Sequence, residues 1–378
     1  MNARLKSGLL IALRFGLTAV LLAVAVLMID FSDRTVFHLK SGERVEAFSW
    51  SEKNGRVHAV TSKDGSNCRE FDAGEVKARV EEPGLAGLLN QARLWPAVLV
   101  VPAVLMIYLS QAARWRLLLR ANDFEVPLGR AFRVTWSGAF FNQILPGSVG
   151  GDVAKALIVA HGESRKAAAI GTVILDRLVG LATVVFIAGL AVLPVLGRAE
   201  LRPVVWFIVT LMAAGLVGGL LYFNPAVRRW GPARRLKDRL PFRRAIEEVD
   251  DVLKTMHHAP RTILGAVGLS AVGQASTILG IYALAASIGG GGVPLSDFFL
   301  LEPIIFLVTA LPISVGGWGV EQVAYAQLFG MAGMAANTAV TLSVLYKLSG
   351  LAVSLPGGIL FAAGATRKAA VADPASQR

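Results

Sequence analysis

The stretch LPGSVGGD, at Leu145–Asp152, interrupts strongly apolar sequence, and a near copy, LPISVGGW, does the same at Leu311–Trp318. Six of the first seven residues agree between the two. A proline removes a backbone N–H and ends a helix, while paired glycines permit the chain to reverse. Each stretch therefore predicts a break between two helices, and the near identity predicts an internal repeat.

The sequence around these breaks is typical of a membrane protein. The 378 residues are 54% apolar and 17% charged, with a mean hydropathy of +0.57, whereas soluble domains carry about 25% charged residues. Several apolar runs, among them Leu9–Ile29 and Leu94–Leu119, reach the roughly 20 residues that a helix needs to cross a bilayer. The sequence therefore predicts an all-α polytopic membrane protein.

The segments beside the two breaks are too short to cross a bilayer alone. Val134–Leu145 would form about 18 Å of helix, little more than half of the hydrocarbon thickness, and Asp152–Ala160 is equally short. Phe298–Leu311 and Gly319–Phe329 form a second such pair. Each pair could be one broken span, or a re-entrant hairpin that enters and leaves the membrane on the same side.

A basic cluster at Arg228–Arg244 separates these alternatives. It holds eight basic residues and one acidic residue, and such clusters favour the cytoplasmic side. If a hairpin precedes them, the spans Ala167–Leu196 and Pro203–Phe223 place the cluster in the cytoplasm, whereas one broken span would place it outside. We therefore expect re-entrant hairpins. We also expect this cluster to contact anionic lipid headgroups and not a nucleic acid.

The remaining charges and spans assign sides to the rest of the chain. Leu94–Leu119 ends on Arg114, Arg116 and Arg120, which indicates a cytoplasmic end.

After the cytoplasmic basic cluster, the span Thr262–Ile288 returns to the outer face, and the last span, Asn337–Ala363, leads back inside to Arg367 and Lys368. The second hairpin would therefore enter from outside, so the two breaks would face each other as an inverted repeat. The expected fold has about six full spans and two opposed re-entrant helical hairpins. The expected location is a bacterial-type inner (plasma) membrane, with both termini in the cytoplasm.

Residues 31–90 differ from the rest because acids and bases nearly balance there and short stretches alternate as β-strands do. We expect a small β-rich extracytoplasmic insertion, with turns such as Asn54-Gly55. Its sequence does not reveal its role, and binding of a periplasmic partner is one alternative. The predicted organisation is 1–30, a membrane anchor; 31–90, the insertion; 91–366, the transmembrane domain; and 367–378, a cytoplasmic tail.

Metal and cofactor chemistry is not indicated by the sequence. Cys68 is the single cysteine, and the five histidines lack the spacing of a ligand set. The stretch LPGSVGGDVAK also lacks the GK[ST] ending of a P-loop. We therefore expect no metal ion and no cofactor.

The breaks form the predicted binding site. Helices that restart there direct free N–H groups and a partial positive charge toward the middle of the membrane, where an anion such as phosphate can bind. Arg177 with Lys155 could hold a lipid phosphate that Asp152 and Asp176 orient. Ionisable residues at such depth could instead be internal ion pairs that hold the bundle together. The predicted headgroup-binding residues are Asn142, Gln143, Ser148, Gly150, Gly151, Asp152, Lys155, Asp176, Arg177, Glu302, Ser314, Gly316, Gly317, Glu321 and Lys347.

A separate hypothesis makes Glu302 and Glu321 proton carriers that couple transport to a gradient. Their depth in apolar sequence is its only motivation. It predicts that replacing both with glutamine removes the dependence of transport on the proton gradient.

Three stretches of the sequence resemble one known family. FFNQILPGSVGGDVAKALIV (140–159), LDRLVGL (175–181) and LPISVGGWGV (311–320) are similar, in this order, to the lysylphosphatidylglycerol synthase transmembrane-region family, also described as flippase-like or dolichol-phosphate-glucose synthetase-like. The resemblance covers residues 94–365 and the first span. It implies an integral inner-membrane protein whose relatives move charged phospholipids between leaflets or belong to hopanoid or polyprenyl-linked glycan pathways.

The sequence departs from this family's pattern in places. Lys155 stands where arginine is often found, and Glu321-Gln322 stands where an Arg-Glu pair often follows the second motif, which weakens any role carried over to that position. The insertion 31–90 lies outside the family core. The soluble stretches are too short for the aminoacyl-transferring domain of bifunctional relatives, so we expect this chain not to make lysyl-lipid by itself.

The sequence therefore predicts a flippase-like lipid transporter that moves an anionic phospholipid or isoprenoid-type lipid through a midplane site between the two hairpins. One alternative is a membrane glycosyltransferase or accessory protein that acts on a polyprenyl-phosphate-linked substrate. Such an enzyme usually needs an acidic metal or nucleotide-sugar site, and the acidic stretch Glu247–Asp251 is more simply a solvated helix face. Another alternative is a scaffold whose insertion recruits a partner.

Overall fold

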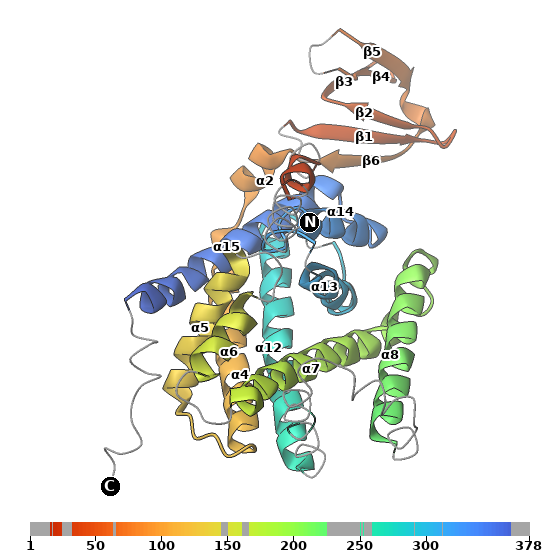
Figure 1. The fold of residues 1–378 in the computed structure, drawn as a ribbon. Coiled ribbons are helices and arrows are strands. Elements are labelled where there is room, and N and C mark those ends of the chain that lie inside the picture. The colour runs from red at the N-terminus through yellow and green to blue at the C-terminus, as the bar shows by residue number, and fades with distance from the viewer. Residues whose placement is uncertain are drawn as a thin grey trace, which may run out of the picture.

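The computed structural model is mostly helical, with the long helices gathered in a bundle and two small sheets at one end (Figure 1). It describes residues 16, 18–24, 32–62, 66–144, 150–160, 166–224, 250, 252, 259–290, 292–311 and 313–363.

Five helical segments of the described chain are long and apolar enough to cross a membrane: Trp95–Arg120, Ala167–Val195, Ala199–Leu221, Pro260–Ser287 and Ala336–Ala362. They contain α3 (Leu94–Val98), α4 (Val100–Arg120), α7 (Lys166–Ala191), η2 (Leu193–Val195), η3 (Ala199–Leu201), α8 (Arg202–Phe223), α12 (Pro260–Ser287) and α15 (Ala336–Ala362). These spans confirm the prediction of a multi-pass membrane protein. The sixth expected span, Leu9–Ile29, lies largely outside the described residues, although 18–24 are helical.

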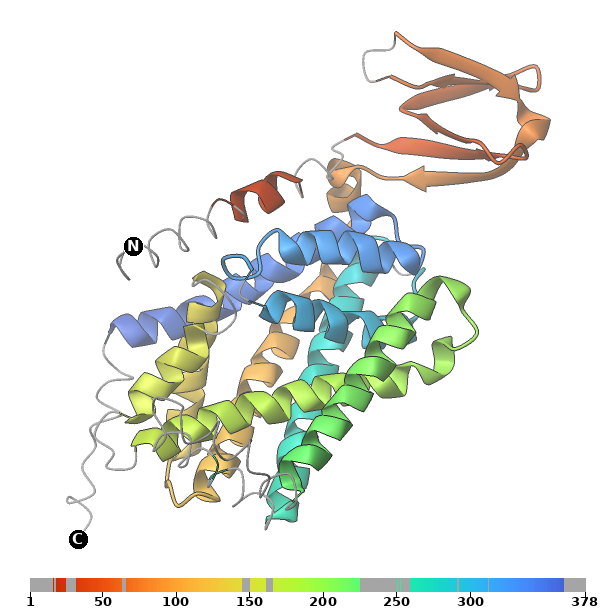
Figure 2. The ribbon, with the colours of Figure 1, turned by 45° about the vertical axis from the view of Figure 1, so that its right-hand side comes forward.

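The helices α4 and α12 pack side by side along most of their length (Figures 1 and 2). Glycines on α12 permit the close approach. A Cβ at Gly273 would lie 3.0 Å from Ser110 Cβ, and one at Gly280 would lie 2.6 Å from Ala103 Cβ. Small residues at such contacts let two backbones approach and gain dispersion energy in a medium where burial from lipid gives little. The pair forms a rigid wall of the bundle.

We expect Gly280→Val to lower the free energy of unfolding by about 1–3 kcal/mol, because the added side chain must push α4 away. The measurement is the thermal-unfolding midpoint of the purified protein in detergent. Gly268→Val is the control, since it adds the same side chain to the same helix where no atom lies within 4 Å. Equal midpoints for the two variants would contradict the packing argument.

Each of the two sequence breaks separates a pair of helices. The first break lies between α5 (Leu128–Ile144) and α6 (Gly150–Ala160), and the second lies between α13 (Leu295–Ala310) and α14 (Val320–Met331). The pair α5 and α6 lies toward the end of the bundle away from the strands, whereas α13 and α14 lie nearer the strands (Figures 1 and 2). Residues 145–149 of the first motif and Pro312 of the second lie outside the described residues.

The helix α5 begins earlier than the expected Val134. Pro127 starts it, because its carbonyl accepts the N–H groups of Arg130 and Ala131 at 3.0 and 3.1 Å, and proline is well suited to the first turn of a helix. The predicted start at Val134 is later because only the apolar residues were counted, and Arg130 and Arg133 interrupt the apolar sequence in this first part of the helix.

Glycines turn the chain at the second motif. Gly316, Gly317 and Gly319 have φ values of 57°, 79° and 80°, in the left-handed region that side chains with a Cβ avoid. These positions lead directly into α14, and they confirm the prediction that glycines turn the chain at this break.

The N-terminal segment packs on this same motif (Figure 2). The backbone N–H of Val315 donates to Thr18 Oγ1 at 2.9 Å. A Cβ at Gly319 would overlap the Cβ of Leu21. The segment thus covers the second break.

The insertion consists of two three-stranded antiparallel sheets, ordered β2-β1-β6 and β3-β4-β5. Asn54 and Gly55, with φ values of 52° and 75°, form the β3–β4 turn, as a two-residue hairpin of type I′ requires. Phe37 packs against the rings of Trp50 and Phe71 at the centre of a small core. The strands confirm the expected β-rich insertion, while its boundaries at 31 and 90 stay a prediction. The elements are β1 (Arg34–Leu39), β2 (Arg44–Ala47), β3 (Ser49–Lys53), β4 (Arg56–Val60), β5 (Cys68–Asp72), η1 (Ala73–Glu75), β6 (Val76–Glu82) and then α2 (Leu85–Gln91).

Candidate functional site

Buried charges meet where α4, α7 and α12 come together. Arg114 on α4 donates from Nε to Asp176 Oδ1 on α7 at 2.6 Å, and from Nη1 to Ser270 Oγ on α12 at 2.6 Å. Arg114 and Asp176 are only 7% and 3% exposed. Gly180, one turn after Asp176, leaves room for the guanidinium, because a Cβ there would lie 3.0 Å from Nη1. This network ties three spanning helices together.

The expectation that Arg114, Arg116 and Arg120 mark a cytoplasmic end stays a prediction, but the side chain of Arg114 does not face the surface there. The residue is buried and paired inside the bundle, whereas Arg120 at the end of α4 is exposed. The sequence held a signal for this difference, since the apolar run Leu117–Leu119 follows Arg114 and places it inside the span. Arg114 is the main site residue that the sequence analysis missed.

Lys155 on α6 brings a second cation to Asp176. Its Nζ lies 3.7 Å from Asp176 Oδ2 and 5.4 Å from the centre of the Trp115 ring, within the range of a cation–π interaction. Lys155 is 4% exposed. Asp176 therefore lies between two positive charges, which is why it is stable as a buried carboxylate.

The third cation of the site is Arg177, the neighbour of Asp176 on α7. Its Nη1 is hydrogen-bonded to Asp152 Oδ2 on α6. The backbone N–H of Gly151 donates to Asn142 Oδ1 at 2.6 Å, which connects α6 to the end of α5. Arg177 and Asp152 are more accessible than the Arg114–Asp176 pair, since their side chains are 29% and 22% exposed.

These side chains line one cavity of about 130 Å³. Three of its lining residues are cations (Arg114, Lys155 and Arg177) and two are carboxylates, which leaves one positive charge in excess. The remaining lining includes Ser110, Gln111, Asn142, Thr183, Ser270, Gln274 and Phe306. Ser270 and Gln274 lie near the middle of α12, so the cavity lies deep in the helical bundle. We call it the inner cavity.

A second buried polar group lies on α13, α14 and α15. Lys347 Nζ donates to Glu321 Oε2 at 2.7 Å and lies 5.9 Å from the centre of the Trp318 ring. Glu302 is 5% exposed, and within the described part of the chain no donor reaches its Oε2. The amine of Lys347 also adjoins the second break, since a Cβ at Gly317 would lie 3.4 Å from Nζ.

Gln143 connects the two breaks. A Cβ at Gly316 would overlap the backbone oxygen of Gln143, and a Cβ at Gly350 on α15 would lie 2.9 Å from Gln143 Nε2. Its neighbour Asn142 lines the inner cavity. The end of α5 therefore touches the inner cavity on one side and the second motif on the other.

The predicted headgroup residues thus fall into two groups. Asn142, Gly151, Asp152, Lys155, Asp176 and Arg177 gather at the inner cavity, and Gln143, Glu302, Gly316, Gly317, Glu321 and Lys347 gather at the second break. Gly150 begins α6, and Ser314 is buried in the second motif. Ser148 lies outside the described residues. Arg177 pairs with Asp152, and Lys155 pairs with Asp176. The assignment of these residues to a lipid headgroup stays a prediction.

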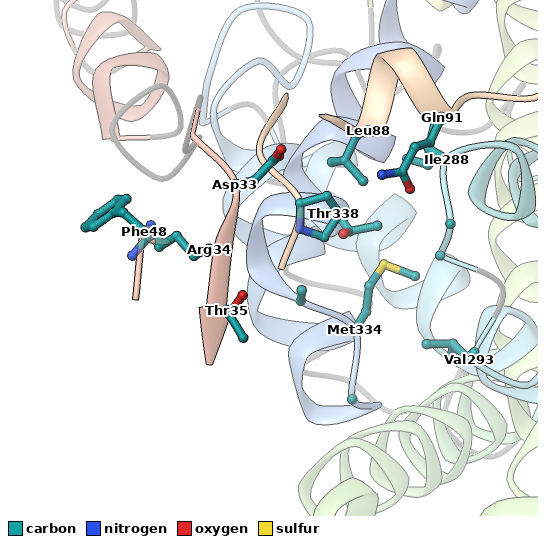
Figure 3. A pocket seen from close by; sticks show the side chains of 16 residues that line it. Asp33, Arg34, Thr35, Phe48, Leu88, Gln91, Ile288, Val293, Met334 and Thr338 are labelled. Atoms are coloured by element: carbon teal, nitrogen blue, oxygen red, sulfur yellow. The ribbon is translucent and has the colours of Figure 1, made fainter. Parts of the chain in front are cut away.

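A larger cavity of about 500 Å³ lies where the insertion meets the bundle (Figure 3). Asp33, Arg34 and Phe48 of the insertion, Leu88 and Gln91 of α2, and Met334 and Thr338 near the start of α15 contribute to its lining. Asn337 Nδ2 donates to the carbonyl of Pro83 at 2.8 Å, and the backbone N–H of Gly84 donates to Asp33 Oδ1 at 2.7 Å. This cavity could not be predicted from the sequence, because its lining residues come from segments that are distant along the chain.

Within the described residues, no group of three or more His, Cys, Asp or Glu side chains is arranged to hold a metal ion. The two groups of charged residues are ion pairs with hydrogen-bonding neighbours, an arrangement suited to binding a charged headgroup or a proton.

The chain is similar to known membrane proteins. It is 23% identical over 289 residues to the UPF0104 membrane protein PH1989 of Pyrococcus horikoshii. The aligned region covers 69% of this chain and 85% of that protein. The family described as "Lysylphosphatidylglycerol synthase TM region" matches residues 80–358, which include both motifs and every described charged residue of the inner cavity. The match spans more than half of the chain and begins at the last strand of the insertion. The chain is therefore a membrane protein of the lysylphosphatidylglycerol synthase TM-region family.

Proposed function

We propose that this protein moves an anionic lipid, either a phospholipid or an isoprenoid-type lipid phosphate, between the two leaflets of a bacterial-type inner membrane. The observation that carries the proposal is the inner cavity, which is deep in a membrane bundle and lined by one more cation than carboxylates. A charge at such depth is costly unless it is paired. A phosphate group would balance the excess charge of the described lining residues.

Arg177 is the cation that we assign to the headgroup. Its side chain is 29% exposed, compared with 9% for Arg114 and 6% for Lys155, so it is the one that a ligand reaches with the least rearrangement. Its planar guanidinium can bind two phosphate oxygens at once. Arg114 and Lys155 hold Asp176 and set a positive field around the cavity.

The arrangement of the broken helices supports the same proposal. The pairs α5/α6 and α13/α14 lie toward different ends of the bundle (Figure 1), and Gln143 joins the two breaks. We propose that both pairs are re-entrant hairpins that enter from opposite faces, as broken helices do at midplane sites of transporters. In this topology both termini and the basic cluster at 228–244 are cytoplasmic, and the insertion is available to a periplasmic partner.

We expect Arg177→Ala to slow lipid movement by about tenfold to a hundredfold, because one charge-assisted contact contributes roughly 1.5–3 kcal/mol. The measurement is the leaflet distribution of labelled anionic lipids over time in proteoliposomes. Arg120→Ala, which removes an equal charge from the exposed end of α4, is the control and should move lipid at the wild-type rate.

Two other results would reject the proposal. Equal rates for wild type, Arg177→Ala and protein-free vesicles would show that the protein does not move these lipids. Turnover of a nucleotide sugar onto a polyprenyl phosphate, without lipid movement, would favour the glycosyltransferase alternative.

A further inference from the structure

The polar group around Glu302 contains more buried oxygen atoms than its neighbours satisfy. Glu302 on α13 and Glu321 on α14 are each 5% exposed, and Tyr325 on α14 is fully buried. Within the described part of the chain, Glu302 Oε2, Glu321 Oε1 and the Tyr325 hydroxyl have no partner with good hydrogen-bond geometry, although the Tyr325 hydroxyl lies close enough to Glu302 to interact with it. Buried polar atoms are normally satisfied, and a proton on one of the two carboxyl groups would add a donor to a group that is rich in acceptors.

The charges of this group do not balance. Among the residues that the structure describes, Lys347 is the one cation that faces the two carboxyl groups, and it binds Glu321 at 2.7 Å. The other titratable neighbours are tyrosines, which are neutral donors: Tyr325 on α14, Tyr346 on α15 and, beyond it, Tyr108 on α4. If both carboxyl groups were ionised, one negative charge would remain buried without a counterion, which is costly inside a membrane.

A proton is the smallest species that restores the balance. Glu321 is already neutralised by Lys347, so the proton belongs on Glu302. When Glu302 releases that proton to water, two carboxylates compete for Lys347, whose amine adjoins Gly317 of the second break. Loss of the proton therefore changes the charge beside the second motif.

Glu302 is also close to the inner cavity along its own helix. Phe306, which lines that cavity, is four residues further along α13, on the same face and about one turn away. A change of charge at Glu302 thus lies one helical turn from a residue that lines the inner cavity.

We propose that Glu302 takes up one proton from water on one side of the membrane and releases it to water on the other side in each transport cycle. This inference rests on the proposed lipid transport, but the proton site can be observed without it. It assigns different roles to the two glutamates: Glu302 exchanges the proton, and Glu321 holds Lys347.

The first test detects the proton directly. We expect infrared spectra of the purified protein in lipid to show a protonated-carboxyl band that disappears as the pH is raised. The band should be absent from E302Q and retained in E200Q, which alters an exposed carboxylate on η3. If E302Q does not fold, E302D keeps a carboxyl group at this place and should retain a titrating band. Absence of such a band from the wild-type protein, or its full retention in folded E302Q, would overturn the proposal.

The second test measures coupling in proteoliposomes. With one proton per lipid, a gradient of one pH unit shifts the equilibrium distribution of the lipid between leaflets by up to about tenfold. We expect this shift for the wild-type protein, and the same distribution with and without the gradient for E302Q.

The outcomes separate the two proposals. A titrating band without any lipid movement would reject the transport function and leave the proton site in place. Lipid movement that ignores the pH gradient, or that follows a sodium gradient instead, would reject proton coupling and leave the transport function in place.

Discussion

Asp176→Ala is expected to lower the free energy of unfolding by about 3–5 kcal/mol, the largest change that we expect from one side chain of the inner cavity. The substitution leaves Arg114 and Lys155, which are 7% and 4% exposed, without their shared counterion. Removing one partner of a buried ion pair is strongly destabilising because the other charge remains buried and unpaired. The measurement is the thermal-unfolding midpoint in detergent, with Glu200→Ala, an exposed carboxylate, as the control.

A second variant separates stability from function. Replacing Arg114, Lys155 and Asp176 together with Leu, Met and Leu removes all three charges and keeps much of the apolar volume. Replacing buried ion pairs with apolar side chains is often neutral or stabilising, so the triple variant should unfold close to the wild-type temperature. It should nevertheless fail to move anionic lipids, because the positive field of the cavity is lost. Normal lipid movement by this stable variant would show that the three charges serve only to hold the bundle together.

Gly316→Ala has the second large effect that we expect. The glycine has a φ of 57°, and an added Cβ would overlap the backbone oxygen of Gln143. The left-handed conformation costs a residue with a Cβ about 1–2 kcal/mol, and the overlap adds to that because a backbone atom cannot move away as a side chain can. We expect a lower unfolding midpoint and at least a tenfold slower movement of lipid, since the contact between the two breaks is forced open.

Gly333→Ala is the matched control for this variant. Gly333 also has a positive φ, 90°, but an added Cβ would meet no atom within 4 Å. The control therefore reports the backbone strain alone, and the difference between the two variants reports the contact with Gln143. If both variants behave alike, the contact between the breaks has no role in stability or transport.

Sequence reasoning worked best where a local rule determines the structure. The prolines and glycines predicted both helix breaks, and the glycines of the second motif adopt the left-handed backbone that only such residues allow easily. In the first motif the glycine pair does not turn the chain, because Gly150 and Gly151 already belong to α6. Asn54 and Gly55 predicted a hairpin turn for a similar reason. Length and apolar content were sufficient to predict five spans of the described chain.

The pairing of the buried charges could not be predicted in the same way. Asp176 contacts Arg114, which is 62 residues away along the chain, and only the packing of α4 against α7 brings them together. Counting Arg114 with Arg116 and Arg120 as the basic end of a span does not reveal which face of the helix each residue occupies. Arg114 faces the bundle, whereas Arg120 does not.

The hydrogen bond between Val315 and Thr18 has a consequence for the order of biosynthesis. The two residues are 297 positions apart, and ribosomes add roughly 5–20 residues per second. Thr18 therefore leaves the ribosome about 15 to 60 seconds before its partner exists. During that interval this hydrogen bond cannot form, so the segment around Thr18 cannot dock on the second motif until residue 315 has been made. Its docking is then one of the last steps of assembly, so release of a truncated nascent chain before residue 315 would leave that segment without its final position.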